Sequence, residues 1–109
     1  MVEGPVLPNS VRDKLLRNEV ASTLSVKLVR SVELPMMAKT AGFDGILIDM
    51  EHSVLTIRDV SQLILACNYV GVSPIVRIPS KSHWQLSRIL DAGAAAVVIP
   101  HVESVDQVR

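Results

Sequence analysis

Short apolar runs alternate with helical patterns along most of the chain. The runs at 22–29, 45–49, 74–79 and 95–101 are rich in Val, Ile and Leu, as strands usually are. The run GILID at 45–49 is almost continuously apolar, which is typical of a strand that is buried on both faces. Strands that alternate with helices in this way predict βαβ units and a parallel sheet.

Helical segments with recognisable ends lie between the apolar runs. Residues 31–40 predict a helix with Pro35 in its first turn, where a missing N–H costs least. Another helix is expected to begin after Ser82 and to end at Gly93, because serine is a common N-cap and glycine a common C-terminal stop.

Two capping patterns mark further helix starts. Thr56 and Asp59 resemble a capping box, with Asp in place of Glu, and Gly71 ends the helix that follows. Ser104 and Gln107 have the same spacing, so the sequence predicts the beginning of one more helix close to Arg109.

The N-terminal 20 residues differ from the rest of the chain. Residues 1–20 are expected to form an irregular lead-in and a short helix capped by Asn9 or Ser10. The apolar stripe expected on this helix consists of Val11, Leu15 and Leu16. The regular alternation of strands and helices then occupies residues 21–109, which we interpret as one partial domain.

An internal repeat indicates what kind of parallel sheet this is. AGFDGILID at 41–49 and AGAAAVVIP at 92–100 begin 51 positions apart, or two βα units of about 25 residues each, and a (β/α)₈ barrel of eight such units has about 250 residues. The predicted fold class is therefore α/β, with parallel βα repeats that form about the first four strands of a (β/α)₈ TIM barrel. Four strands alone would leave two sheet edges unprotected, so the chain is either part of a larger barrel or must associate. A small open α/β fold is the alternative.

Composition and charge exclude several classes of function. Eleven basic and eleven acidic residues give a formal net charge of zero, which argues against binding to nucleic acid or to an anionic membrane surface. No apolar segment approaches the roughly 20 residues of a membrane span, and no secretory signal pattern is present. The single cysteine, Cys67, excludes an internal disulfide and is expected to be a buried, inert thiol. We expect a cytoplasmic protein.

Chemically active side chains follow the predicted strands at their C-terminal ends. These residues are Asp49, Glu51, His52, Arg77 and His101, and less convincingly Lys27, which could point outward. Functional groups of parallel α/β proteins gather at this edge of the sheet. An acid, an imidazole and a guanidinium together suit an anionic substrate and proton transfer.

Each of these residues also has a purely structural interpretation. Asp49 could accept hydrogen bonds from loop N–H groups, and Glu51 could be a solvated charge or an ion-pair partner. Arg77 is harder to dismiss, because a charge inside PIVRIP must be paired or lie at the edge of the sheet. Asp91 opposes the dipole at a helix C-terminus, which hints at another purpose. The sequence contains no Gly-rich phosphate loop and no HExxH metal motif.

Three motifs together resemble a known family. AGFDGILIDMEHS, SPIVRIPS and ILDAGAAAVVIPHVESVDQVR are similar in order and spacing to the HpcH/HpaI aldolase and citrate lyase superfamily, over about residues 24 to 109. The resemblance is strongest to the 2-oxo-acid aldolases of that group. It implies a (β/α)₈ barrel that cleaves a 4-hydroxy-2-oxo acid into pyruvate and an aldehyde with the help of a divalent metal, Mg²⁺, Mn²⁺ or Co²⁺.

The resemblance also implies roles for individual residues. His52 matches the histidine general base and Asp49 its partner acid. Arg77 matches the arginine that binds pyruvate and stabilises the developing enolate. Asp91 matches an aspartate that lines the site, in some members from the neighbouring subunit.

The metal ligands of the family lie on later strands, so none is expected in this chain, and Glu51 is not expected to replace them. A homo-oligomer acting on a small 2-oxo acid is the expected assembly. Two alternatives remain open. The chain could be a truncated, non-catalytic half-barrel that needs a partner chain, or a relative of the citryl- and malyl-CoA lyases.

Overall fold

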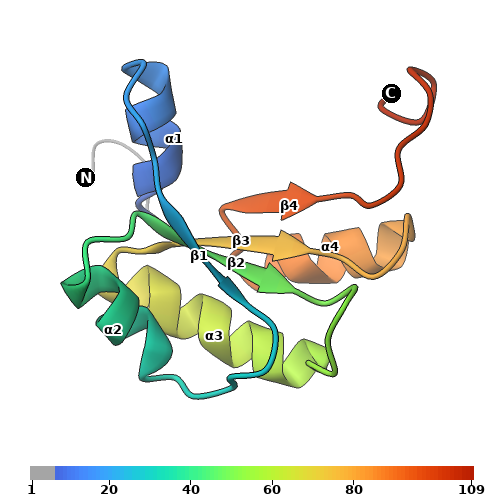
Figure 1. Ribbon diagram of the computed structural model, residues 1–109. Helices are drawn as coiled ribbons and strands as arrows, with labels where there is room; N and C mark the ends of the chain where they lie inside the picture. The colour runs from blue at the N-terminus through green and yellow to red at the C-terminus, as the bar shows by residue number, and fades with distance from the viewer. Residues whose placement is uncertain (1–6) are drawn as a thin grey trace, which may run out of the picture.

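The computed structural model describes residues 7–109, and over this range it contains four helices and four strands (Figure 1). In chain order these are α1 (Ser10–Leu16), β1 (Thr23–Val26), α2 (Leu34–Thr40), β2 (Gly45–Asp49), α3 (Ile57–Val70), β3 (Ser73–Arg77), α4 (His83–Asp91) and β4 (Ala96–Val98). Residues 1–6 of the expected lead-in lie outside the described residues.

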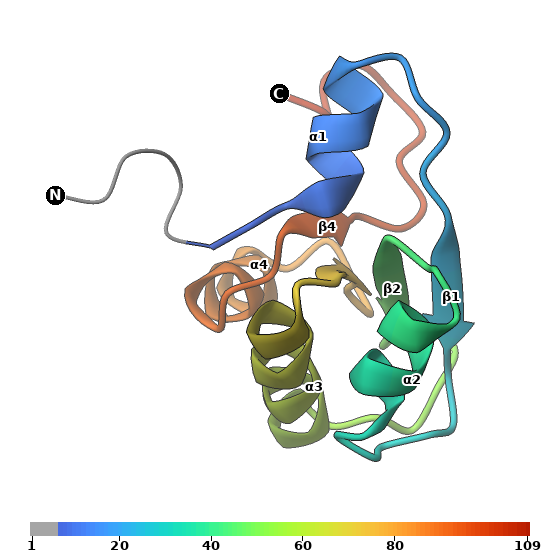
Figure 2. The ribbon, with the colours of Figure 1, turned by 90° about the vertical axis from the view of Figure 1, so that its left-hand side faces the viewer.

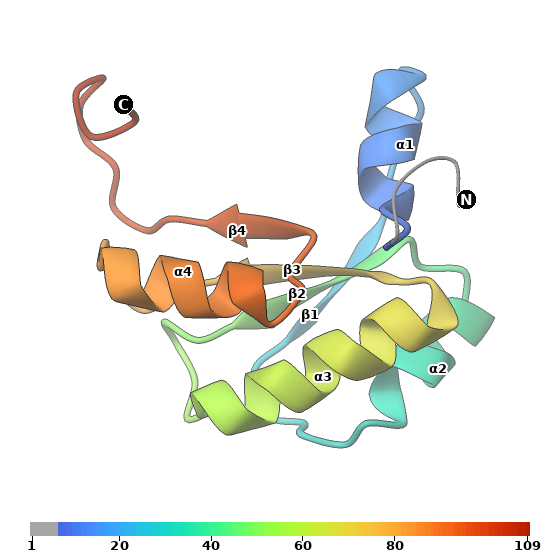
Figure 3. The same cartoon turned by 180° about the vertical axis from the view of Figure 1, so that it is seen from behind.

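All four strands are parallel and are adjacent in chain order, β1-β2-β3-β4. The helices α2, α3 and α4 lie together on one face of the sheet (Figures 2 and 3), as right-handed βαβ crossovers require. A sheet with strands in chain order and helices on one side is the arrangement of consecutive units in a βα barrel. The predicted α/β class with parallel βα repeats is confirmed.

The core lies between the sheet and these helices. Ile46, Ile48 and Val76 point toward the helices and are fully buried, since successive side chains of a strand point to opposite faces. Val60, Leu63, Ile64 and Cys67 of α3 are also fully buried and belong to the same cluster. Burial raises the pKa of the Cys67 thiol to about 12, so this cysteine is the inert core residue that the sequence predicts.

The opposite face of the sheet is open. Cross-strand pairing places four residues in one row, namely Ser25, Leu47, Ile75 and Ala96. Ser25 and Ala96 are exposed, and the two larger side chains are only partly buried. In a closed barrel the face away from the helices lines the interior. We call this face, defined by that row, the inner face.

The helix α1 packs across the N-terminal end of the sheet (Figure 1). Asn9, one of the two predicted caps, is its N-cap and accepts a hydrogen bond from the Arg12 N–H. The Ser10 hydroxyl donates to the Asp44 carbonyl, and the Val11 N–H donates to the Ser73 hydroxyl. These contacts join the start of α1 to the N-terminal ends of β2 and β3.

The predicted apolar stripe of α1 is only partly correct. Val11 lies against Gly45, where an added Cβ would be only 2.8 Å from a Val11 methyl and 2.9 Å from the Ser73 carbonyl oxygen. The glycine therefore permits the close approach of α1 to the sheet. Leu15 and Leu16, in contrast, remain 60% and 68% exposed.

The α3 helix follows its predicted ends closely. Thr56 and Asp59 form the capping box in both directions, and Gly71 ends the helix with a left-handed φ of 81°. The α2 helix begins three residues later than expected, but Pro35 does lie in its first turn. Ser82 precedes α4 as expected, although its side chain makes no capping hydrogen bond within the described part of the chain.

Two predictions near the C-terminus are wrong. The last strand covers three residues rather than seven, because Pro100 has no N–H to continue the ladder and His101 has a left-handed φ of 55°. The segment after Ser104 forms turns instead of a helix. There the Gln107 side chain accepts a hydrogen bond from the Glu103 N–H, so it closes a turn one residue before the expected cap.

None of the helices in residues 7–109 is long and apolar enough to cross a membrane.

Candidate functional site

A buried ion pair joins the C-terminal ends of β2 and β3 on the inner face. Asp49 and Arg77 are directly paired across the two strands. Arg77 Nε donates to Asp49 Oδ1 at 3.1 Å and one Nη donates to Oδ2 at 2.5 Å, a two-point contact that fixes the guanidinium plane. The Asp49 side chain is fully buried, whereas the Arg77 side chain is 28% exposed. The Arg77 side chain is therefore partly accessible to solvent.

The charge state of this pair is set by the contact itself. The hydrogen bond from Arg77 holds the pKa of the Asp49 carboxyl well below its ordinary value, and the N–H groups of His52 and Glu51 act in the same direction against the opposing effect of burial. The hydrogen bond to Asp49 raises the pKa of Arg77. Asp49 is thus a carboxylate at any physiological pH.

The loop after β2 is organised around Asp49. Its Oδ1 accepts hydrogen bonds from the N–H of Glu51 at 2.9 Å and of His52 at 3.1 Å. The Ser53 hydroxyl donates to the Asp49 carbonyl. These bonds fold residues 50–53 into a tight turn, which sends the Glu51 and His52 side chains to the C-terminal edge of the sheet. Asp49 therefore has the structural role that the sequence allowed, in addition to its contact with Arg77.

Glu51 connects the two histidines of this edge. One carboxylate oxygen lies 2.8 Å from His52 Nε2, and the other lies 2.7 Å from His101 Nε2. The first oxygen also lies 3.7 Å from Arg77 Nε. The Glu51 side chain is only 10% exposed, while the imidazoles of His52 and His101 are 59% and 72% exposed. A shielded carboxylate thus lies between two imidazoles that are open to solvent.

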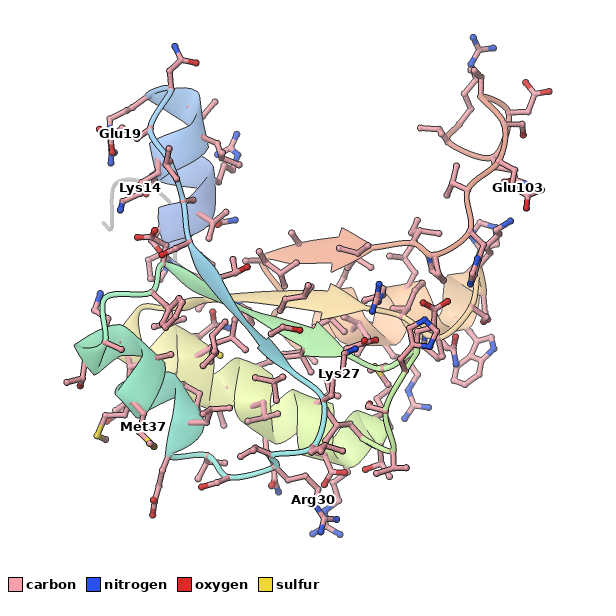
Figure 4. All side chains as sticks on the ribbon, in the orientation of Figure 1. Lys14, Glu19, Lys27, Arg30, Met37 and Glu103 are labelled. Carbon is pink, nitrogen blue, oxygen red and sulfur yellow. The ribbon has the colours of Figure 1, made fainter. Side chains whose placement is uncertain are left out.

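Two further residues approach the same edge. Lys27 directly follows β1 (Figure 4), and its Nζ lies 3.9 Å from Asp49 Oδ2, so it points toward the pair and not outward. His101 follows β4 and has a left-handed backbone, which is uncommon for a residue other than glycine. From this position its imidazole contacts Glu51.

The structure thus brings together most of the predicted residues, but with different partners. Asp49 and His52 are neighbours, yet the Asp49 carboxylate bonds to the backbone N–H of His52 and not to its imidazole. The imidazole contacts Glu51 instead. Sequence reasoning placed Glu51 and His101 at this edge without predicting that they would meet. Their positions at the ends of strands indicated that both residues lie at this edge. The contact between Glu51 and the histidines depends on the turn after Asp49, which the sequence pattern does not specify.

Asp91 is not part of this cluster within the chain. It is the last residue of α4, and α4 runs antiparallel to the strands (Figure 3). It therefore lies at the N-terminal edge of the sheet and is exposed there. A contribution of Asp91 to the site of a neighbouring subunit stays a prediction.

The donor set does not fit a bound metal. Within residues 7–109, no group of three or more His, Cys, Asp or Glu side chains is placed to hold a metal ion. Glu51 and the two histidines are close, but the Nε2 atom of each imidazole is directed at the carboxylate.

The arrangement can bind an anion and move a proton. Arg77 offers its remaining N–H groups at the open inner face, and Lys27 adds a second positive charge near it. A carboxylate or a 2-oxo acid is the kind of ligand that a fixed guanidinium recognises. The imidazole of His52 lies next to that anion site, and an imidazole can act as a general base or acid.

Comparison with known proteins finds relatives that match much of this chain. The family model for HpcH/HpaI aldolase/citrate lyase matches residues 27–109. The chain is 32% identical over 102 residues to the 4-hydroxy-4-methyl-2-oxoglutarate aldolase tasA of Hapsidospora irregularis, which covers 93% of this chain and 38% of the relative. It is 42% identical over 69 residues to the hydroxypyruvate/pyruvate aldolase of Paraburkholderia phytofirmans, which covers 62% of this chain and 26% of the relative.

A solved structure has the same fold over nearly the whole chain. The HpcH/HpaI aldolase from Desulfitobacterium hafniense DCB-2 superposes with a TM-score of 0.88 at 29% identity, covering 95% of this chain and 39% of that protein. The chain thus spans about two fifths or less of the relatives that it matches. The match to the family model extends over most of its length, and the chain belongs to the HpcH/HpaI aldolase/citrate lyase family.

Proposed function

We propose that this chain supplies the proton-transfer and anion-binding half of an aldolase site that cleaves a 4-hydroxy-2-oxo acid into pyruvate and an aldehyde. The observation that carries the proposal is the pairing of Arg77 with buried Asp49 at the C-terminal edge of the sheet, next to His52. Relatives named as aldolases of 4-hydroxy-4-methyl-2-oxoglutarate and of hydroxypyruvate and pyruvate support the substrate class.

Arg77, Asp49 and His52 each have a separate role in the proposed reaction. Arg77 binds the 2-oxo acid and stabilises the negative charge that develops as the enolate of pyruvate forms. Asp49 holds the guanidinium plane in place. His52 removes the proton of the 4-hydroxyl group, the bond between C3 and C4 breaks, and the aldehyde carbonyl forms.

A divalent metal belongs to the proposal but not to the described residues. Mg²⁺, Mn²⁺ or Co²⁺ would supply charge stabilisation at the substrate oxygens, and its ligands would come from residues outside this chain. We further propose that the complete protein is a homo-oligomer, in which Asp91 of one subunit reaches the site of another.

The proposed activity is tested with the full-length gene product. Release of pyruvate from a 4-hydroxy-2-oxo acid is measured with added Mg²⁺, Mn²⁺ or Co²⁺, and after treatment with a chelator. We expect cleavage that depends on the metal. Complete absence of pyruvate with a panel of 4-hydroxy-2-oxo acids and all three metals would contradict the proposal.

The open inner face favours a second candidate for the 109-residue chain by itself. The row Ser25, Leu47, Ile75 and Ala96 is incompletely covered, and within the described residues β1 and β4 pair on one side only. Such a half-barrel would be non-catalytic and would require a partner chain to cover this face.

Two measurements on the isolated chain separate these candidates. Size-exclusion chromatography with light scattering should show self-association if the inner face needs a partner. A compact, well-folded monomer would contradict the partner-dependent half-barrel, and pyruvate release by the 109-residue chain alone would contradict its inactivity.

A further inference from the structure

The position of Glu51 is not accounted for by the roles given to Asp49, Arg77 and His52. Its side chain is 10% exposed, and both of its oxygens are occupied, by His52 Nε2 at 2.8 Å and by His101 Nε2 at 2.7 Å. A carboxylate with a different ring nitrogen at ion-pair distance from each oxygen restricts the orientations of both imidazoles. Glu51 is the only carboxylate among the described residues whose oxygens lie within ion-pair distance of an imidazole.

We propose that Glu51 is the positioning residue for the His52 imidazole. By accepting a hydrogen bond from Nε2–H, it selects the tautomer that carries the proton on Nε2 and leaves the Nδ1 lone pair free. Nδ1 is then the atom that takes up the substrate proton. This inference rests on the proposed function for its chemical consequence, but the tautomer itself does not depend on it.

The proton transfer balances at the named atoms. The O–H bond of the 4-hydroxyl group breaks and a bond from Nδ1 to hydrogen forms. The electron pair left on oxygen becomes the aldehyde carbonyl as the C3–C4 bond breaks, and the electrons of that bond become the enolate. The imidazolium that results lies against the Glu51 carboxylate, which stabilises its charge as a buried acid does in other acid–histidine pairs.

The contacts and charges around the two carboxylates favour Glu51 over Asp49 as the partner of the His52 imidazole. Asp49 is fully engaged by Arg77 and by two backbone N–H groups, and Lys27 lies on its other side. Arg77 Nε lies 3.7 Å from one Glu51 oxygen, so its positive charge also lies beside Glu51. Glu51 is therefore the carboxylate left to face the two imidazoles.

His101 stabilises this arrangement from the opposite side. It comes from the end of β4, and its backbone has the left-handed φ of 55°, which brings its ring to the second oxygen of Glu51. A carboxylate held from two strand ends has less rotational freedom than one held from a single loop. The His101 contact thus fixes the position of Glu51, and Glu51 fixes that of His52.

The tautomers can be measured on the 109-residue chain without any turnover. The chain contains three histidines, and His83 is exposed at the start of α4, so it reports the tautomer mixture that solvent allows. In ¹⁵N-histidine-labelled protein above about pH 8, where imidazoles are neutral, we expect the ring nitrogen shifts of His52 and His101 to show nearly pure Nε2–H tautomer. They should converge on the His83 values in Glu51→Ala, and remain unchanged in the matched control Glu103→Ala. Identical shifts for all three rings in the wild type, or no convergence in Glu51→Ala, would overturn the proposal.

A kinetic measurement on the full-length gene product tests the consequence. Glu51→Gln should lower kcat for pyruvate release at least tenfold while KM for the 2-oxo acid stays within about twofold, because Arg77 still binds the substrate. A kcat within twofold of the wild type would overturn the positioning role. A wild type without activity would instead refute the proposed function, and the tautomer measurement would then decide the inference about Glu51 alone.

Discussion

At the scale of single residues, the charge on Asp49 is the most demanding feature of the site. Its side chain is fully buried, and a buried carboxylate is costly unless it is paired and hydrogen-bonded. Arg77 provides two of its hydrogen bonds, and the turn after β2 provides two more. The same contacts that allow the charge to be buried also orient the guanidinium for an anion.

Replacing Arg77 by Met should therefore destabilise the fold strongly. Asp49 would keep its burial and lose its partner, and removing one member of a buried pair costs about 3 kcal/mol or more. Urea unfolding followed by circular dichroism measures the free energy of unfolding. The control is Arg58→Met, which removes an exposed arginine of α3 and should change stability by less than about 0.5 kcal/mol. Equal effects of the two substitutions would show that the pair contributes little.

The lowered pKa of Asp49 gives a second prediction, for the pH dependence of stability. Its folded-state pKa lies below the ordinary value of 3.8, so the unfolded chain takes up this proton first as the pH falls. The stabilisation is fully present above that ordinary value and is lost as the pH falls toward the folded-state pKa. The stability difference between wild type and Asp49→Asn should be constant from about pH 5 to 8 and should shrink below about pH 4. A difference that grows on acidification would contradict this account.

At the scale of elements, capping signals in the sequence were reliable where all of the capping partners are close to one another in the chain. Thr56, Asp59 and Gly71 predicted both ends of α3, because all of the capping partners lie within a few residues of one another. Ser104 and Gln107 have similar spacing, but the Gln107 side chain bonds to Glu103 and also accepts from Lys81. A competing partner that is distant in sequence cannot be recognised from spacing alone.

The capping box of α3 can be tested by one substitution. Thr56→Ala removes the side-chain acceptor of the Asp59 N–H and should lower the free energy of unfolding by about 1 kcal/mol. Ser61→Ala, inside the same helix, removes a hydroxyl that only bonds back to the Arg58 carbonyl, and should be neutral or slightly stabilising. A larger loss for Ser61→Ala than for Thr56→Ala in thermal or urea unfolding would refute the cap assignment.

The site was predictable in its residues but not in its contacts. The rule that groups gather at strand ends placed Asp49, His52, Arg77 and His101 at one edge, and the structure confirms their common location. The choice of Glu51 over Asp49 as the partner of the imidazole depends on a turn of four residues, which hydrophobic periodicity does not specify. Lys27 was similarly ambiguous, since the side to which it points depends on where β1 ends.

At the scale of the whole molecule, the described residues form a four-stranded sheet with one face covered and the other open. The helices cover one face of the sheet, and α1 covers its N-terminal end (Figure 1). The inner face and the charged C-terminal edge remain accessible. This is the arrangement that a barrel enzyme requires, because its substrate enters at the C-terminal ends of the strands. The proposed division of labour follows, with anion binding and proton transfer supplied by this chain and the metal held by other residues.

The most direct test of this account is the rate of pyruvate release by the His52→Ala variant of the full-length gene product. His83→Ala serves as the matched control, since His83 lies on α4 and outside the cluster. We predict that His52→Ala lowers kcat at least about 100-fold, the typical contribution of a general base, and that His83→Ala retains the wild-type rate. Unchanged pyruvate release by His52→Ala would contradict the central claim.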